Sequence, residues 1–163
     1  AADILGYAAP QYLGLPENHG DTLPLNELVA PIEALLREHT PHEVYVPFGN
    51  SLHADHKKAY QAAITAARPL PGSSVRSLLA YEIISSTDWA PPADGAFTPD
   101  SFVEITPVLT QKMDAIAAYD FEMRDEPHAR SVQAVERLAQ LRGNTVGFAA
   151  AEAFMTVRRR NPA

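Results

Sequence analysis

The sequence predicts an α/β fold with a mostly parallel sheet, and two observations support that prediction. Runs rich in β-branched and aromatic residues, such as 43–47 and 75–84, alternate with stretches of helical periodicity, which is the pattern of strand–helix–strand units. The chain has 163 residues, of which 46% are hydrophobic and 20% charged, so it can form one domain with a buried core. We therefore expect a single domain over residues 1–163.

The N-terminal half is predicted to contain two long helices. Residues 1–7 have the pattern of the last turn of a helix that ends at Gly6. After it we expect a strand at 11–15, a loop at 16–20, a helix at 25–40, a strand at 43–47 and a helix at 53–68. Asp21 or Thr22 would cap the helix at 25–40, and Pro31 predicts a kink or a later start of that helix.

The C-terminal half is predicted to add strands and helices in turn. The expected elements are a strand at 75–84 that is the longest of the chain, a loop at 88–99, a strand at 102–105, a helix from 107 to about 124, a helix at 132–142, a short helical piece at 147–154 and a closing strand at 155–158. Ser131 would cap the helix that follows it, and Gly143 would end that helix. Three or four short strands make a thin sheet, which predicts that part of the domain lies outside this chain.

Composition excludes several classes of function. The net charge is −7 and there are no cysteines, which argues against nucleic-acid binding and excludes disulfides, thiol nucleophiles and cysteine-ligated zinc. The basic run 158–160 is expected to be a solvated tail. No apolar stretch approaches the ~18 residues of a membrane span, and no signal peptide opens the chain. We therefore expect a soluble, cytoplasmic protein.

One cluster, His53-Ala54-Asp55-His56, dominates the candidates for chemistry. It lies where a strand and loop lead into a helix, at the edge where α/β proteins bind ligands. Two histidines with a carboxylate between them indicate a metal site. The alternative is a polar helix start, in which Asp55 stabilises the helix N-terminus. A catalytic zinc needs three protein ligands, so further ligands should come from another segment.

A second candidate is the segment before the helix at 132–142. His128 and Arg130 lie in Glu126-Pro127-His128-Ala129-Arg130-Ser131. The segment is either a capped helix start or a loop that contributes His128 and Arg130 to a polar substrate pocket.

The His-x-Asp-His motif and its flanks resemble the PIG-L/LmbE-like family of zinc-dependent N-acetylglucosaminyl deacetylases. The matching flanks follow the family's order over nearly the whole chain, at Leu13-Gly14-Leu15-Pro16, Asp21-Thr22-Leu23-Pro24, Ala66-Ala67-Arg68-Pro69, Pro71-Gly72-Ser73-Ser74-Val75, Ser85-Ser86-Thr87-Asp88-Trp89, Pro127-His128, Arg130-Ser131, Arg142-Gly143 and Ala151-Glu152-Ala153-Phe154. The resemblance implies a Rossmann-like three-layer fold. It also implies a hydrolase that removes acetyl from an N-acetylglucosamine-type conjugate with zinc-activated water.

The resemblance assigns roles to three residues. His56 corresponds to a zinc ligand, and His53 to the group that stabilises the oxyanion or assists the leaving amine. Asp55 would orient and tune the histidine pair. The family's Ala-His-Pro-Asp-Asp-Glu motif, which supplies two zinc ligands and the general base, is absent from this sequence. We therefore expect the C-terminal two-thirds of a deacetylase domain, which associates with the missing N-terminal segment or forms a homo-oligomer.

Two alternatives remain beside a zinc-dependent deacetylase. A metallo-β-lactamase-type hydrolase is disfavoured, because Ser51 stands where that superfamily's motif has its first histidine. A degenerate domain that binds sugars or partners without turnover would explain the absent base. The expected partner of the deacetylase is a small-molecule N-acetyl sugar conjugate.

Overall fold

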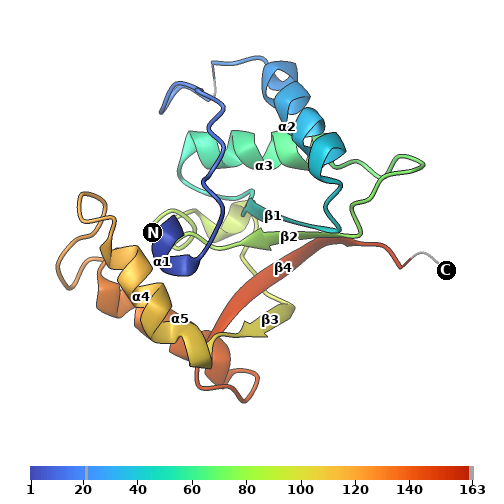
Figure 1. Cartoon of the computed structure of the whole chain (residues 1–163). Helices are drawn as coiled ribbons and strands as arrows, with labels where there is room; N and C mark the ends of the chain where they lie inside the picture. Colours follow the sequence, from blue (N-terminus) through green and yellow to red (C-terminus); the bar gives the residue numbers. More distant parts are fainter. Residues whose placement is uncertain (21, 162–163) are drawn as a thin grey trace. The chain divides into compact units, whose positions relative to one another are not determined.

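The computed structural model describes residues 1–20 and 22–161 (Figure 1). The chain divides into two compact units, one made of Ala1–Tyr12 with Ser101–Ala153 and the other of Leu13–Asp100 with Phe154–Ala163. We refer to them as the first and the second unit and describe each by itself. Asp21, one of the two expected helix caps, lies outside the described residues.

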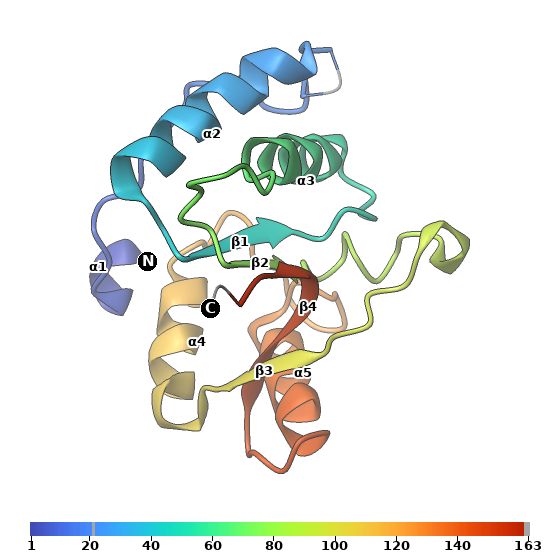
Figure 2. The same cartoon turned by 90° about the vertical axis from the view of Figure 1, so that its right-hand side faces the viewer.

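The second unit is built on two parallel strands. β1 (Glu43–Pro47) pairs with β2 (Ser77–Tyr81), so that Val44 lies opposite Leu78 and Val46 opposite Ala80. The helices α2 (Leu25–His39) and α3 (Ala54–Ala66) lie on the same side of these strands in both views (Figures 1 and 2). A short 3₁₀ helix, η1 (Pro92–Asp94), follows in the loop after β2.

The core of this unit lies between the strands and α3. Leu78 is fully buried, and the other buried members of the cluster are Val46, Phe48, Ala63, Ala67, Val75 and Ala80. Alanines on the inner face of α3 allow the helix to approach the strands closely. This packing sets the direction of α3 relative to β1, and α3 begins at the candidate site.

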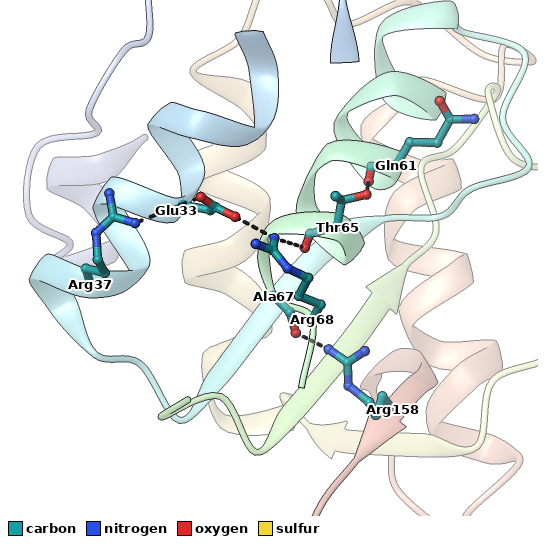
Figure 3. A network of polar contacts seen from close by, with 7 residues as sticks. All are labelled: Glu33, Arg37, Gln61, Thr65, Ala67, Arg68 and Arg158. Atoms are coloured by element: carbon teal, nitrogen blue, oxygen red, sulfur yellow. Dashed lines mark hydrogen bonds and ion pairs between the residues drawn. The ribbon is translucent and has the colours of Figure 1, made fainter. Parts of the chain in front are cut away.

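Polar contacts connect the two helices of this unit (Figure 3). Arg68, just after α3, donates to the carboxylate of Glu33 on α2, and Arg37 on α2 forms a longer ion pair with the same carboxylate. Thr65 donates from its hydroxyl to the carbonyl oxygen of Gln61, 2.7 Å away. The Thr65 bond lies within α3, so only the ion pairs of Glu33 involve α2, and surface ion pairs of this kind contribute little to stability.

The basic run 158–160 is part of this structure and is not a solvated tail. Arg158 donates to the carbonyl oxygen of Ala67 at the end of α3 (Figure 3). Arg160 donates from Nη2 to the carbonyl oxygens of Ser73, 2.8 Å away, and Val75, 2.7 Å away. The two guanidinium groups satisfy carbonyl groups that no helix or strand pairs.

The first unit holds the remaining elements. They are α1 (Ala2–Leu5), β3 (Ser101–Glu104), η2 (Thr106–Val108), α4 (Leu109–Ala117), α5 (Val132–Asn144) and the first three residues of β4 (Ala151–Arg159). Ile105, Ala139 and Ala150 form its buried cluster, with Leu109 packed against them. α1 ends as expected at Gly6, whose φ is 73°, and Ser131 caps α5 by accepting from the Ala134 amide at 3.1 Å.

The α/β class is confirmed, whereas the sheet is mixed. Hydrogen bonds give the strand order β1-β2-β4-β3. β1 and β2 are parallel, but β4 pairs antiparallel with β2, so that Ala80 lies opposite Met155. The expected mostly parallel sheet therefore holds for one pair and fails where β4 joins it.

Several expected elements are wrong in type or length. Residues 11–15 form no strand, and 147–154 hold the start of β4 in place of a helical piece. The longest described strand is β4, since β2 covers only five residues. α4 ends at Ala117 and does not continue to 124.

Caps and helix ends also differ from the expectation. Thr22 does not cap α2; its hydroxyl donates to the carbonyl oxygen of His19, 2.8 Å away. α2 begins at Leu25 and contains Pro31, so the helix does not start late. Gly143 lies inside α5, which ends at Asn144, so it does not end the helix. The backbone of Phe148 and Ala150 packs against it and leaves no room for a side chain.

Candidate functional site

The site lies in the second unit, where β1 leads into α3. His53 is the N-cap residue of α3, with extended backbone (φ −79°, ψ 123°), and its Nδ1 accepts from the Asp55 amide at 3.2 Å. The preceding loop is held by the Leu52 amide, which donates to the carbonyl oxygen of Ser86 at 2.9 Å. The loops after two parallel strands thus meet at one edge, where ligands bind in α/β folds.

The two histidine rings of the motif stack on each other. The ring centroids of His53 and His56 are 4.5 Å apart and the ring planes differ by 20°. Ser51, which is 1% exposed, contacts both residues through one oxygen. Its Oγ accepts from the His53 amide at 3.2 Å and lies 3.0 Å from Nδ1 of His56.

The hydrogen bonds of His53 determine where its proton lies. Its Nδ1 accepts a backbone N–H, so in the neutral ring the proton is on Nε2. His53 therefore presents a hydrogen-bond donor outward. A donor of this kind can stabilise a developing oxyanion.

His56 is suited to bind a cation. Burial lowers the pKa of His56, the neighbouring His53 lowers it further, and the negative charge of Asp55 opposes both effects. The neutral imidazole is the form that binds metals. If Nδ1 of His56 donates to Ser51, the lone pair of Nε2 remains free for a ligand bond.

Asp55 makes contacts that the sequence does not predict. Its Oδ2 accepts from the Asn18 amide at 2.7 Å and its Oδ1 from the Gly20 amide at 2.8 Å. Burial raises the pKa of Asp55, but these two hydrogen bonds and the nearby histidines lower it more, and the net pKa lies below its ordinary value. The carboxylate thus connects α3 to the loop 17–20. Motif spacing carries no signal for such a contact; only the turn-forming residues of the loop indicate that it is ordered.

The described residues do not form a complete metal site. Within 1–20 and 22–161 no three histidine, aspartate or glutamate side chains come together so as to hold a metal ion. A catalytic zinc requires three protein ligands. Of the motif, His56 is the side chain whose surroundings suit a ligand.

His128 and Arg130 belong to the first unit and form a local network. Nδ1 of His128 accepts from the Arg130 amide at 3.0 Å, and Arg130 donates to the carboxylate of Glu122 at 2.6 Å. Ser131 caps α5 directly after them. The segment is thus a capped helix start, and a contact of His128 or Arg130 with substrate stays a prediction.

No described helix is long and apolar enough to cross a lipid bilayer. No family model matches the sequence. No curated protein matches it either.

Solved structures share the fold. Conserved protein TT1542 from Thermus thermophilus superposes with a TM-score of 0.75 at 24% identity, over 99% of this chain and 71% of that one. N,N'-diacetylchitobiose deacetylase from Pyrococcus horikoshii, complexed with its inhibitor MPG, gives 0.72 at 20% identity, over 96% and 60%.

Two further structures show that this fold carries more than one reaction. GalB, the 4-carboxy-2-hydroxymuconate hydratase from Pseudomonas putida KT2440, gives a TM-score of 0.67 at 20% identity, over 99% of this chain and 70% of that one. The zinc-inhibited form of teicoplanin deacetylase Orf2 gives 0.62 at 18% identity, over 94% and 61%. The chain thus spans 60% and 61% of the two deacetylases, and at these identities the likeness establishes the fold.

Proposed function

We propose that the chain contributes part of the active site of a zinc-dependent hydrolase that removes acetyl from an N-acetylglucosamine-type conjugate. The observation that carries the proposal is the His53–His56 pair. One ring presents a proton on Nε2, and the other lies in surroundings that favour its neutral, metal-binding form. The fold likeness to two deacetylases supports the same reaction class.

Each residue of the motif has a distinct part in this proposal. Nε2–H of His53 donates to the oxygen of the acetamide as negative charge develops there, a contact worth roughly 2.7–4 kcal/mol in other enzymes. His56 provides one ligand through Nε2. Asp55 places a negative charge next to both rings. His128 and Arg130 are proposed to contact the substrate.

The described residues do not include the groups that would activate the attacking water molecule. Two further ligands and the general base would come from an additional segment that associates with this chain or from a neighbouring subunit. Zinc, once held by a complete ligand set, would supply an acidified water molecule and polarise the carbonyl group.

Metal content and acetate release test the proposal together. Because two ligands and the base are not among the described residues, the chain would be joined to an upstream Ala-His-Pro-Asp-Asp-Glu segment. We would then measure zinc per chain by elemental analysis and acetate released from N,N'-diacetylchitobiose and from N-acetylglucosamine. The variants are His56→Ala and, as a matched control, His39→Ala, because the His39 side chain is 54% exposed and lies at the end of α2, outside the motif.

The expected result is zinc binding and acetate release that His56→Ala abolishes and His39→Ala leaves intact. Zinc binding that survives His56→Ala would remove this residue from the ligand set. A folded protein that binds the sugar without zinc and releases no acetate would instead indicate a non-catalytic domain.

A further inference from the structure

We propose that Asp55 is a positioning residue that holds the loop 17–20 against the start of α3 and so fixes the imidazole of His19 at the site. The resemblance assigns Asp55 to the histidine pair, whereas its two hydrogen bonds run to a segment more than thirty residues earlier. The inference deepens the proposed function and rests on it for the nature of the substrate.

Both oxygens of the Asp55 carboxylate are used by the loop. The amides of Asn18 and Gly20 lie on either side of His19, and each donates to a different oxygen. Hydrogen bonds to a charged group are stronger than those between neutral groups. Asn18 has a φ of 58°, a left-handed turn conformation that asparagine adopts more readily than most other residues. The carboxylate adds to the local hydrogen bonds of the loop by accepting from the amides on both sides of His19.

Gly20 packs so closely against Asp55 that there is no room for a side chain at position 20. A Cβ atom at this position would lie 2.7 Å from Oδ1 of Asp55 and 3.3 Å from its Cα. Any side chain at position 20 would push the carboxylate away. A Gly20→Ala substitution thus breaks the same contact as a change at Asp55, without altering any charge.

The loop gives His19 a defined orientation and tautomer. Its Nδ1 lies 2.7 Å from the carbonyl oxygen of Glu17. A carbonyl oxygen only accepts hydrogen bonds, so Nδ1 carries the proton and Nε2 of the neutral ring carries the lone pair. His19 lies between the two residues whose amides bond Asp55, so the loop presents this acceptor nitrogen next to the start of α3. In the proposal, a sugar hydroxyl donates to it.

Amide hydrogen exchange tests the hold on the loop without requiring activity. We would compare the whole chain with D55N and G20A, and with D114N as a matched control, because Asp114 is exposed on α4. The side-chain amide introduced by D55N has one acceptor oxygen, so it could accept from one of the two loop amides but not from both. We expect exchange at the Asn18 amide to rise at least tenfold in D55N and in G20A and to stay unchanged in D114N. Unchanged exchange in both D55N and G20A would overturn the proposal.

Kinetics of acetate release separate the positioning role from a direct action on the histidines. We expect G20A and H19Q each to raise KM for N,N'-diacetylchitobiose several-fold with little change in kcat. D55N should raise KM at least as much as G20A, and D55N/G20A should have the KM of D55N. A fall in kcat in D55N with no effect of G20A would show that Asp55 acts on His53 and His56 directly. If the wild-type chain joined to the upstream Ala-His-Pro-Asp-Asp-Glu segment releases no acetate, the proposed function fails, and the exchange result still decides whether Asp55 holds the loop.

Discussion

Ser51 contacts both histidines of the site through a single buried hydroxyl group. Its Oγ lies within hydrogen-bond distance of the His53 amide and of Nδ1 of His56. Groups that bond the second nitrogen of a metal-binding histidine fix its tautomer and ring orientation. Ser51 therefore determines whether Nε2 of His56 presents a lone pair.

We predict that Ser51→Ala weakens zinc binding by about 10- to 100-fold, the usual effect of removing such a partner. Isothermal titration with zinc would measure it. Ser86→Ala is the control, since Ser86 supports the neighbouring loop through its backbone carbonyl. Equal zinc affinity in Ser51→Ala and the wild type would show that Ser51 has no part in setting the tautomer.

The lowered pKa of His56 predicts a pH dependence of stability in the metal-free protein. The unfolded chain protonates this residue near its ordinary pKa of about 6.5, whereas in the folded chain burial and His53 resist protonation despite Asp55. The free energy of unfolding should therefore be highest above about pH 6.5 and fall as the pH decreases toward the folded pKa. Urea unfolding between pH 7.5 and 5 would measure this, and His56→Gln should flatten the slope. An unchanged slope in that variant would assign the effect to other groups.

At the scale of elements, α5 depends on a glycine in its last turn. A Cβ on Gly143 would lie 2.7 Å from both N and Cα of Ala150 and 2.8 Å from the carbonyl oxygen of Phe148. Helix propensity alone favours alanine over glycine by about 1 kcal/mol. The close contact with the backbone before β4 should therefore outweigh helix propensity and make a side chain at position 143 destabilising.

We predict that Gly143→Ala destabilises the protein by about 1–3 kcal/mol, the usual cost of overpacking. Chemical unfolding of the wild type and the variant would measure the difference. A stabilised variant would mean that helix propensity outweighs the contact with Ala150.

Local patterns explain which elements were predictable. β1 and α3 were predicted almost at their observed bounds, because β-branched residues and alanines indicate them locally. The expected closing strand at 155–158 lies within β4 and is confirmed. The start of β4 falls in the helical piece expected at 147–154, since Ala151-Glu152-Ala153 favours a helix by propensity. Ala151 and Ala153 are both buried in the strand, and only pairing with distant strands determines that outcome.

The same difference between local and distant contacts holds for the candidate site. The spacing of His53 and His56 placed both imidazoles at the start of α3, and the structure stacks their rings. The contacts of Asp55 with Asn18 and Gly20 join segments that no local pattern connects. The proximity of the two histidines, which lie within one helical turn, is therefore predictable from the sequence. The contact of Asp55 with the loop 17–20 is not, because more than thirty residues separate the two segments.

At the scale of the whole molecule, β1 ends the order β1-β2-β4-β3 and so pairs on one side only among the described strands. An edge strand presents unpaired amide and carbonyl groups that can pair with another chain. Tyr45 lies in the middle of β1 and is 46% exposed.

We predict that the purified chain self-associates through this edge. Sedimentation velocity over a range of concentrations should detect oligomers, and Tyr45→Lys should shift them toward monomer because a charge on an edge strand opposes pairing. Tyr12→Lys is the matched control, as Tyr12 is 86% exposed outside any strand. A monomer at every concentration would contradict the prediction.

The arginines that hold the end of β4 differ in one respect from the ion pair between Arg68 and Glu33. Arg158 and Arg160 donate to neutral carbonyl oxygens, so dissolved ions have no opposing charge to screen. In concentrated sodium chloride α2 loses part of its hold on the end of α3, while the C-terminal strand keeps its attachment. The guanidinium ion, which presents the same donors as an arginine side chain, can compete for those carbonyl groups, so guanidinium chloride should release β4 more readily than urea does.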